Sequence, residues 1–191
     1  MFRRGFKTWS EETSLRVRQR LGVTSAAPLD PLRLAELLSV QVISTHEVDG
    51  LPEDCQRRLA NEHSECWSAI TVTSGGYHLI VVNTAHKETR RNSDLAHELA
   101  HIILGHEPSV MFVSPQSNTA LRTHNKEQEE EANWLAGCLL LPRDALVSIR
   151  SRRLSDSDAS GEYCVSQAML RYRLNVSGVE IQFRRRRTAR P

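Results

Sequence analysis

The sequence predicts an α+β fold in which a small antiparallel β-sheet is surrounded by helices. Two β-rich runs, Cys66–Val72 and Tyr77–Asn83, flank Ser74–Gly76, and a Gly-Gly pair between such runs is typical of a hairpin. Most other segments carry helix caps or an apolar helical face rather than strand alternation. With 191 residues, the chain is long enough for one domain and at most a small appendage.

The composition excludes several classes of protein. Hydrophobic residues make up 39% and charged residues 25%, which is a globular rather than a disordered composition. The 25 basic and 23 acidic residues leave a net charge of +2, so the whole molecule is not an evident polyanion binder. No stretch approaches the roughly 18 apolar residues of a membrane span. Met1–Glu12 lacks the apolar core of a signal peptide, so we expect a cytoplasmic protein.

The four cysteines show neither a zinc-ribbon spacing nor a disulfide framework. They stand at positions 55, 66, 138 and 164, at long and irregular intervals. In a cytoplasmic protein, such cysteines are ordinary reduced thiols. We expect Cys138 to lie in the core.

The N-terminal third predicts two helices and a strand. The first helix is expected over Ser10–Leu21, with Ser10 as its cap and Gly22 as its stop. The second is expected over Pro31–Leu38, because Asp30 is a good cap and proline is tolerated in a first turn. Val40–Thr45 follows as a short strand.

The middle of the chain predicts two longer helices separated by a loop. Ser93–Leu104 forms the first helix and ends at Gly105. Glu107–His124 then forms a long loop, and a loop of that length in a compact domain is usually functional or mobile. Lys126–Leu141 forms the second helix, with Asn125 as its cap.

The C-terminal part is predicted to be less compact. A short helix is expected over Arg143–Arg150, followed by a polar linker over Ser151–Gly161. Val165–Leu174 is a further helix, with Ser166 as its cap, and Arg184–Arg187 forms a basic tail. We therefore expect residues 1–150 to form the main domain and residues 151–191 to form a linker, a helix and the tail.

The chemistry is carried by an H-E-x-x-H motif, His97–His101, inside a predicted helix. At about 100° per residue, positions four apart lie only about 40° apart around the axis, so both imidazoles project from one face and can hold one Zn²⁺. Glu98 lies about 100° from His97, where it is poorly placed as a ligand but well placed to accept a proton from a water on the metal. These are the mechanics of a metalloprotease.

The same motif also occurs in helices that bind no metal, so its surroundings matter. The neighbouring residues are almost all apolar and predict a buried helix: Leu95, Ala96, Leu99, Ala100, Ile102, Ile103 and Leu104. Two histidines and a glutamate buried together cost several kcal/mol unless they have partners. A metal ion supplies such a partner.

The third ligand must come from elsewhere in the chain. His106 lies roughly 180° from His97 if the helix continues. The metzincin pattern is excluded, because Leu104 and Glu107 stand where it requires Gly and His. The glutamates at the start of the predicted helix Lys126–Leu141 are the candidates for the third ligand. Glu129 shares an inward stripe with small and apolar residues and is favoured, with Glu131 as the alternative; Asn133, one turn after Glu129, could then bind a ligating histidine.

The two motifs together resemble the ImmA/IrrE family of metallopeptidases. Arg90–His106 resembles that family's LAHELGH helix, and Glu129–Pro142 resembles its ExEANxFAxxLLxP helix. Ala100 replaces the usual Gly, Asp94 stands where Thr is common, and Trp134 stands near the usual Phe. None of these changes removes a metal ligand or the base.

The resemblance implies a zincin-like fold and a zinc-dependent endopeptidase. His97, His101 and Glu129 would be the zinc ligands, and Glu98 the catalytic base. Family members regulate transcription in the cytoplasm, and some cleave helix-turn-helix repressors of phages and mobile elements or control stress responses. The implied partner is therefore such a repressor. We expect its peptide to add as a strand between the edge of Tyr77–Asn83 and the motif helix. The oxyanion-stabilising residue, the activating signal and the oligomeric state stay open.

A non-proteolytic regulator that binds DNA or a repressor is the alternative. Val165–Leu174 resembles a helix of a helix-turn-helix unit, and Arg184–Arg187 is strongly basic. DNA contact through this tail would be electrostatic and steeply salt-dependent. In the simpler interpretation, the helix packs Met169, Leu170 and Leu174 onto the domain, and the arginines only increase solubility.

Overall fold

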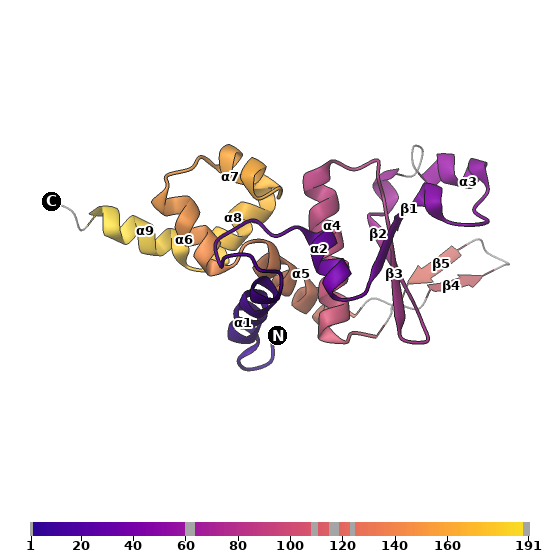
Figure 1. Cartoon of the computed structure of the whole chain (residues 1–191), viewed down its shortest axis with the longest axis horizontal. Coiled ribbons are helices and arrows are strands. Elements are labelled where there is room, and N and C mark those ends of the chain that lie inside the picture. The colour runs from indigo at the N-terminus through magenta and orange to yellow at the C-terminus, as the bar shows by residue number, and fades with distance from the viewer. Residues whose placement is uncertain (1, 60–63, 108–110, 115–118, 123–124, 189–191) are drawn as a thin grey trace.

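The computed structural model describes residues 2–59, 64–107, 111–114, 119–122 and 125–188, and it confirms the α+β class (Figure 1). A small sheet lies toward one end of the molecule and the C-terminal helices lie toward the other, with helices α4 and α5 between them. The described α-helices are α1 (Phe6–Arg20), α2 (Pro31–Leu37), α3 (Glu53–Arg57), α4 (Glu88–Leu104), α5 (Lys126–Leu140), α6 (Arg143–Ser151), α7 (Asp156–Glu162), α8 (Gln167–Val176) and α9 (Val179–Thr188). None of them has both the length and the apolar character that a membrane span requires.

The predicted hairpin forms, but the sheet is mixed rather than purely antiparallel. The strands of the main sheet are β1 (Gln41–Ser44), β2 (Ala69–Ser74) and β3 (Tyr77–Val82), in the order β1-β3-β2. β2 and β3 pair antiparallel, whereas β1 pairs parallel with β3. A parallel pair needs a long connection, and the segment between β1 and β3, which contains β2, provides it. β3 is therefore the central strand and β2 an outer one, so Tyr77–Asn83 is not the edge that we expected a peptide to join.

Several helix boundaries follow the predicted caps. The Asp30 carboxylate accepts a 2.9 Å hydrogen bond from the backbone N–H of Leu32 at the start of α2. Asn125 and Ser166 likewise cap α5 and α8. The prediction for α1 was wrong at its start: α1 begins at Phe6, and the Ser10 hydroxyl donates back to the Phe6 carbonyl at 2.8 Å. Phe6 is only 2% exposed, so its burial extends the helix toward the N-terminus.

The segments expected to be irregular contain further elements. The predicted loop Glu107–His124 includes a hairpin of β4 (Met111–Ser114) and β5 (Thr119–Arg122), and the rest of it lies partly outside the described residues. The predicted linker Ser151–Gly161 contains most of α7, where Ser155 caps the helix and Ala159 is fully buried. The predicted basic tail belongs to α9. The serine cap and the buried alanine stabilise α7, although its composition is polar.

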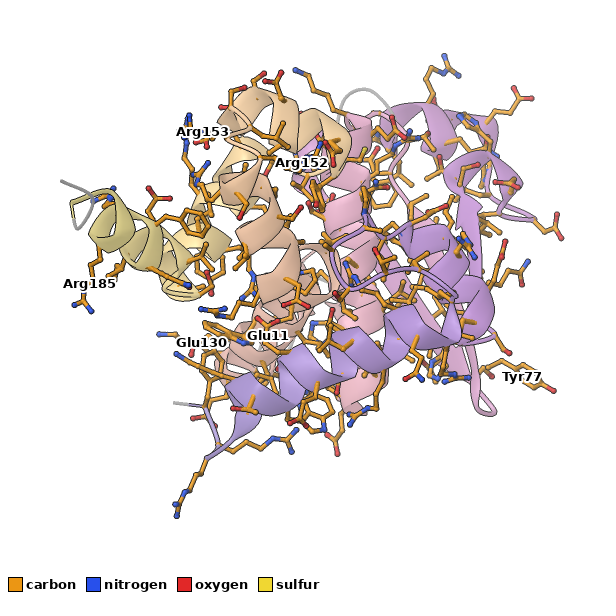
Figure 2. All side chains as sticks on the ribbon, turned by 60° about the vertical axis from the view of Figure 1, so that its left-hand side comes forward. Glu11, Tyr77, Glu130, Arg152, Arg153 and Arg185 are labelled. Atoms are coloured by element: carbon orange, nitrogen blue, oxygen red, sulfur yellow. The ribbon has the colours of Figure 1, made fainter. Side chains whose placement is uncertain are left out.

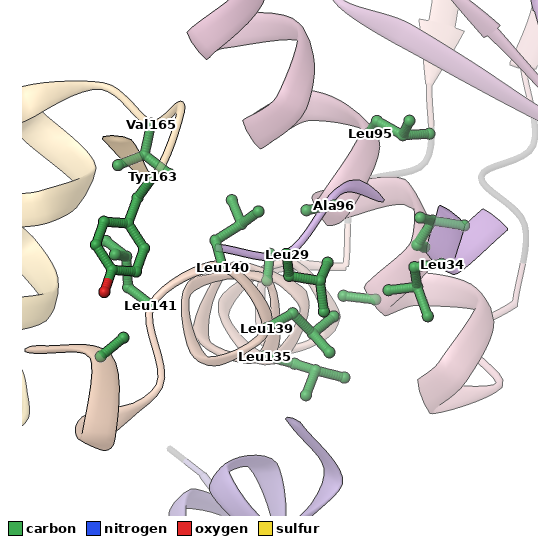
Figure 3. Close-up of a cluster of buried hydrophobic side chains, with 14 of the residues drawn as sticks. Leu29, Leu34, Leu95, Ala96, Leu135, Leu139, Leu140, Leu141, Tyr163 and Val165 are labelled. Carbon is green, nitrogen blue, oxygen red and sulfur yellow. The ribbon is translucent and has the colours of Figure 1, made fainter. Parts of the chain in front are cut away.

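One hydrophobic core surrounds α5 (Figure 3). In the close-up, Leu135, Leu139 and Leu140 project from α5 among side chains from both earlier and later segments. The cluster combines Leu34 and Ala96 with C-terminal side chains such as Val165. Side chains from both sides of residue 150 thus pack into the same core.

Two buried arginines satisfy the carbonyl groups at the C-terminal end of α5. The Arg18 guanidinium donates to the Leu139 carbonyl at 2.7 Å, and the Arg173 guanidinium donates to the Leu141 carbonyl at 3.1 Å. Arg18 is 1% exposed, and its burial lowers its pKa to about 10, which still leaves it charged at neutral pH. The final carbonyls of a helix lack intrahelical partners and carry partial negative charge, so these cations stabilise α5 in its buried position.

Candidate metal centre

The candidate site is formed where α4 and α5 pack side by side. Both helices carry small, buried side chains that belong to the same core: Ala96 and Ala100 on α4, and Ala132 and Ala136 on α5. Such residues let two helices approach closely, because the interaxial distance depends on the side chains at the contact. The close approach brings Glu129 on α5 next to the histidine pair of α4.

The structure brings His97, His101 and Glu129 together. The Nε2 atoms of the two histidines are 3.0 Å apart. The Glu129 carboxylate lies 3.2 Å from His97 Nε2 and 3.7 Å from His101 Nε2. All three side chains are only about one-fifth exposed, so the cluster is sheltered but open to solvent on one side.

These three side chains could hold a metal ion, since one ligand atom from each lies within 4.8 Å of the others. These distances can be compared with those of a tetrahedral zinc site. Ligand atoms about 2.0–2.1 Å from a tetrahedral Zn²⁺ lie about 3.3 Å from one another. The distances of 3.0, 3.2 and 3.7 Å between the ligand atoms of His97, His101 and Glu129 fall on both sides of that value. Two imidazole nitrogens and one carboxylate also match the donor set of catalytic zinc sites, which leave a fourth position for water.

Glu98 lies beside the cluster but is not part of it. Its side chain is directed toward the sheet, where the Thr71 hydroxyl of β2 hydrogen-bonds to Glu98 Oε2. Glu98 is 8% exposed, so this polar partner offsets part of the cost of burying a carboxylate. The structure therefore places Glu98 next to the cluster, on the side of α4 that faces β2.

Glu131, the alternative third ligand, points to a different partner. Its Oε2 lies 3.4 Å from Nε2 of His106, and His106 Nδ1 in turn lies 3.0 Å from His101 Nδ1. His106 therefore contacts the nitrogen of His101 that faces away from the cluster. His106 would lie opposite His97 only if the helix continued. Instead, Gly105 adopts a left-handed conformation with φ of 64°, and the chain reverses and brings the ring back.

Asn133 was expected to bind a ligating histidine, but it is placed elsewhere. It is exposed and lines a hollow of about 570 Å³ together with Ser93, Met169 and Tyr172. Ser93 lies one helical turn before His97, and Asn133 lies one turn after Glu129. The hollow is therefore lined by residues of α4 and α5 that stand one helical turn from the cluster residues, and by residues of α8.

Sequence reasoning did not find Thr71 and gave His106 no role. No local pattern around Thr71 marks it, because its contact depends on how β2 packs against α4. For His106, the signal was the glycine before it, which permits the reversal.

A comparison of the sequence with known protein families agrees with this geometry. Residues 53–175, more than half of the chain, match the family model described as the IrrE N-terminal-like domain, a family of peptidases. The fold and the site thus define a metallopeptidase-type regulatory domain. The chain belongs to the IrrE N-terminal-like peptidase family.

Among solved structures, the chain is similar to a Mycobacterium tuberculosis transcriptional regulator, with a TM-score of 0.56 and 16% identity. The match covers 86% of this chain and 46% of that chain, so this chain spans about half the length of the regulator. At that identity the likeness concerns the fold alone. The search of curated proteins found no match.

Proposed function

We propose that this protein is a zinc-dependent endopeptidase that cleaves a helix-turn-helix transcriptional repressor in the cytoplasm, as part of a phage, mobile-element or stress-response circuit. The observation that carries the proposal is the convergence of His97, His101 and Glu129 beside Glu98. Membership of a peptidase family supports the reaction class. The repressor substrate rests on the resemblance of the two motifs.

In this proposal, each side chain of the site has a distinct task. His97, His101 and Glu129 would hold the ion, which would supply Lewis-acid polarisation of a peptide carbonyl and of a water molecule. Glu98 would accept a proton from the attacking water and pass it to the leaving amine. Thr71 keeps the Glu98 carboxylate in one orientation through its hydroxyl.

The outer strand β2 is the favoured place for the substrate. It carries Thr71 next to Glu98, and the alternate side chains of Ile70 and Val72 are 44% and 50% exposed. An extended peptide that pairs with an outer strand gains backbone hydrogen bonds regardless of its sequence. A peptide on β2 would therefore pass close to the proton acceptor.

DNA binding by the C-terminal region is the second candidate. Arg185 projects from α9 at the far end of the molecule, in keeping with an electrostatic contact to phosphates (Figure 2). The apolar face of α8 is committed to the core, since Leu170 is fully buried and Leu174 is 2% exposed. Arg184 also lies 3.5 Å from Glu180 on its own helix. The burial of Leu170 and Leu174 favours packing over groove recognition for α8.

Metal analysis and cleavage together test the proposal. The purified protein is expected to contain about one zinc per chain, and His97→Ala to contain none. Incubation with a repressor encoded by a neighbouring gene is expected to yield discrete fragments, and Glu98→Gln is expected to abolish them without loss of zinc. An intact repressor with both proteins, together with a DNA shift at low salt, would support the DNA-binding alternative instead.

A further inference from the structure

A hydrogen-bonded pair behind the metal cluster, His106 and Glu131, is not used by the mechanism above. The His106 side chain is 7% exposed and the Glu131 side chain 20%. His106 Nδ1 lies 3.0 Å from His101 Nδ1, and His106 Nε2 lies 3.4 Å from Glu131 Oε2. The three side chains form a chain of contacts that leads from the cluster to a carboxylate.

One assignment of protons satisfies all of these contacts. His101 directs Nε2 toward His97 and Glu129, so a ligating His101 carries its proton on Nδ1. That N–H then donates to His106 Nδ1. His106 accepts there and carries its own proton on Nε2, which donates to the Glu131 carboxylate.

The backbone places this pair through the end of α4. After the left-handed Gly105, the backbone N–H of His106 donates to the His101 carbonyl at 3.1 Å. This hydrogen bond fixes the backbone of His106 one helical turn after His101, whose ring it contacts. Arg3 Nε lies 3.9 Å from Glu131 Oε1, on the side away from His106.

We propose that His106 and Glu131 are positioning residues that fix the tautomer and ring orientation of His101 and so strengthen metal binding. The proposal rests on the metal site of the proposed function. A metal-bound histidine whose second nitrogen donates to a hydrogen-bonded partner is a better ligand, and loss of such a partner weakens metal affinity by about 10–100-fold. Glu131 then acts through His106, not on the metal.

Metal affinity tests the proposal without any substrate. Co²⁺ and Zn²⁺ dissociation constants are measured by chelator competition, with the Co²⁺ absorption spectrum as a report on ligand geometry. His106→Ala is expected to bind about 10–100-fold more weakly and to alter the spectrum. Glu131→Gln is expected to weaken binding less. His106→Gln is expected to recover part of the loss, because an amide can accept from His101 and donate to Glu131.

A control variant and a double variant distinguish a positioning role from a general loss of structure. Glu130→Gln removes a neighbouring exposed carboxylate and is expected to leave the affinity unchanged. The double variant His106→Ala with Glu131→Gln is expected to bind no more weakly than His106→Ala alone, because the two residues act in series. Circular dichroism of the metal-free proteins checks that each variant is folded.

The outcomes are distinct. A His106→Ala protein that binds Co²⁺ within twofold of the parent, with the same spectrum, would overturn the positioning role and leave the metal site intact. Fully additive losses in the double variant would contradict the serial arrangement. A parent protein that binds no Co²⁺ at all would overturn the metal site, and the proposed function with it.

Discussion

The guanidinium of Arg173 on α8 donates a 2.6 Å hydrogen bond to the carboxylate of Glu11 on α1. Arg173 is fully buried and also donates to the Leu141 carbonyl just after α5. The second oxygen of Glu11 accepts from the backbone N–H of Arg143 at the start of α6. This one ion pair therefore connects α1, α8 and the turn that ends the glutamate-bearing helix.

Removal of this arginine is expected to destabilise the fold strongly. Arg173→Met leaves the Glu11 carboxylate and the Leu141 carbonyl without their charged donor, which costs about 3 kcal/mol. Arg171→Met is the matched control, because Arg171 is 63% exposed and pairs only at the surface with Asp156. That change is expected to cost less than about 1 kcal/mol. Urea denaturation measures both, and equal losses would contradict the special role of Arg173.

The same contact makes Gly137 intolerant of a side chain. A Cβ atom at this position would lie 2.6 Å from Arg173 Cδ, and the arginine cannot move aside without losing its partners. Gly137→Ala is expected to cost about 1–3 kcal/mol through overpacking. Gly161→Ala on α7 meets nothing within 4 Å and is expected to stabilise by about 0.5–1 kcal/mol. Thermal unfolding that ranks the two variants in the opposite order would refute this packing argument.

The cysteines are expected to differ sharply in reactivity. Burial raises the pKa of the Cys138 thiol to about 12, whereas Cys55 and Cys66 are exposed. Because the pKa of this thiol is about 9 in the unfolded chain and about 12 in the folded one, its contribution to the free energy of unfolding is fully present below about pH 9. This contribution is lost as the pH rises toward 12. Iodoacetamide at pH 8 is expected to modify Cys55 and Cys66 but to modify Cys138 only after unfolding. Mass spectrometry of the labelled peptides detects this, and rapid native labelling of Cys138 would disprove its burial.

Thr71 is expected to support the proton acceptor without contributing to metal binding. Thr71→Val removes the hydroxyl that bonds Glu98 and should lower kcat by about 10–150-fold, since a hydrogen bond to a charged group contributes about 1.5–3 kcal/mol. Zinc content should not change. Thr73→Val is the control on the same strand, because the Thr73 hydroxyl contacts His78 at the surface instead. Loss of zinc from Thr71→Val would point to a structural defect rather than to Glu98.

Removal of the metal is expected to lower stability. An ion that binds only the folded chain stabilises it by about 4 kcal/mol at a thousandfold excess over its Kd. Added zinc should therefore raise the melting temperature of the metal-free protein but not that of His97→Ala. Differential scanning calorimetry of both proteins checks this, and an equal rise in both would place the zinc elsewhere.

Much of the fold could be predicted because it depends on local patterns. The Gly-Gly hairpin and the caps at Asp30, Asn125 and Ser166 are set within a few residues of chain. The pairing of His97 with His101 follows from helical periodicity in the same way. Glu129 was favoured over Glu131 because its stripe faces inward, and the structure places it at the histidines.

The remaining features depend on contacts between distant segments. The parallel pairing of β1 with β3 depends on the path of the chain between them. α7 has a polar sequence, yet Ala159 buries it against the core. The contact of His106 with His101 could not be predicted, because helical periodicity does not describe the chain beyond the end of its helix.

The contacts of Arg18 and Glu11 on α1 also determine how short a fragment of this chain can be and still fold alone. The family model begins at residue 53, whereas Arg18 and Glu11 on α1 satisfy groups at the end of α5 and the start of α6. A fragment trimmed to the matched residues would leave those groups buried without partners. Any autonomous version of this peptidase domain must therefore keep its first helix, which lies outside the family signature.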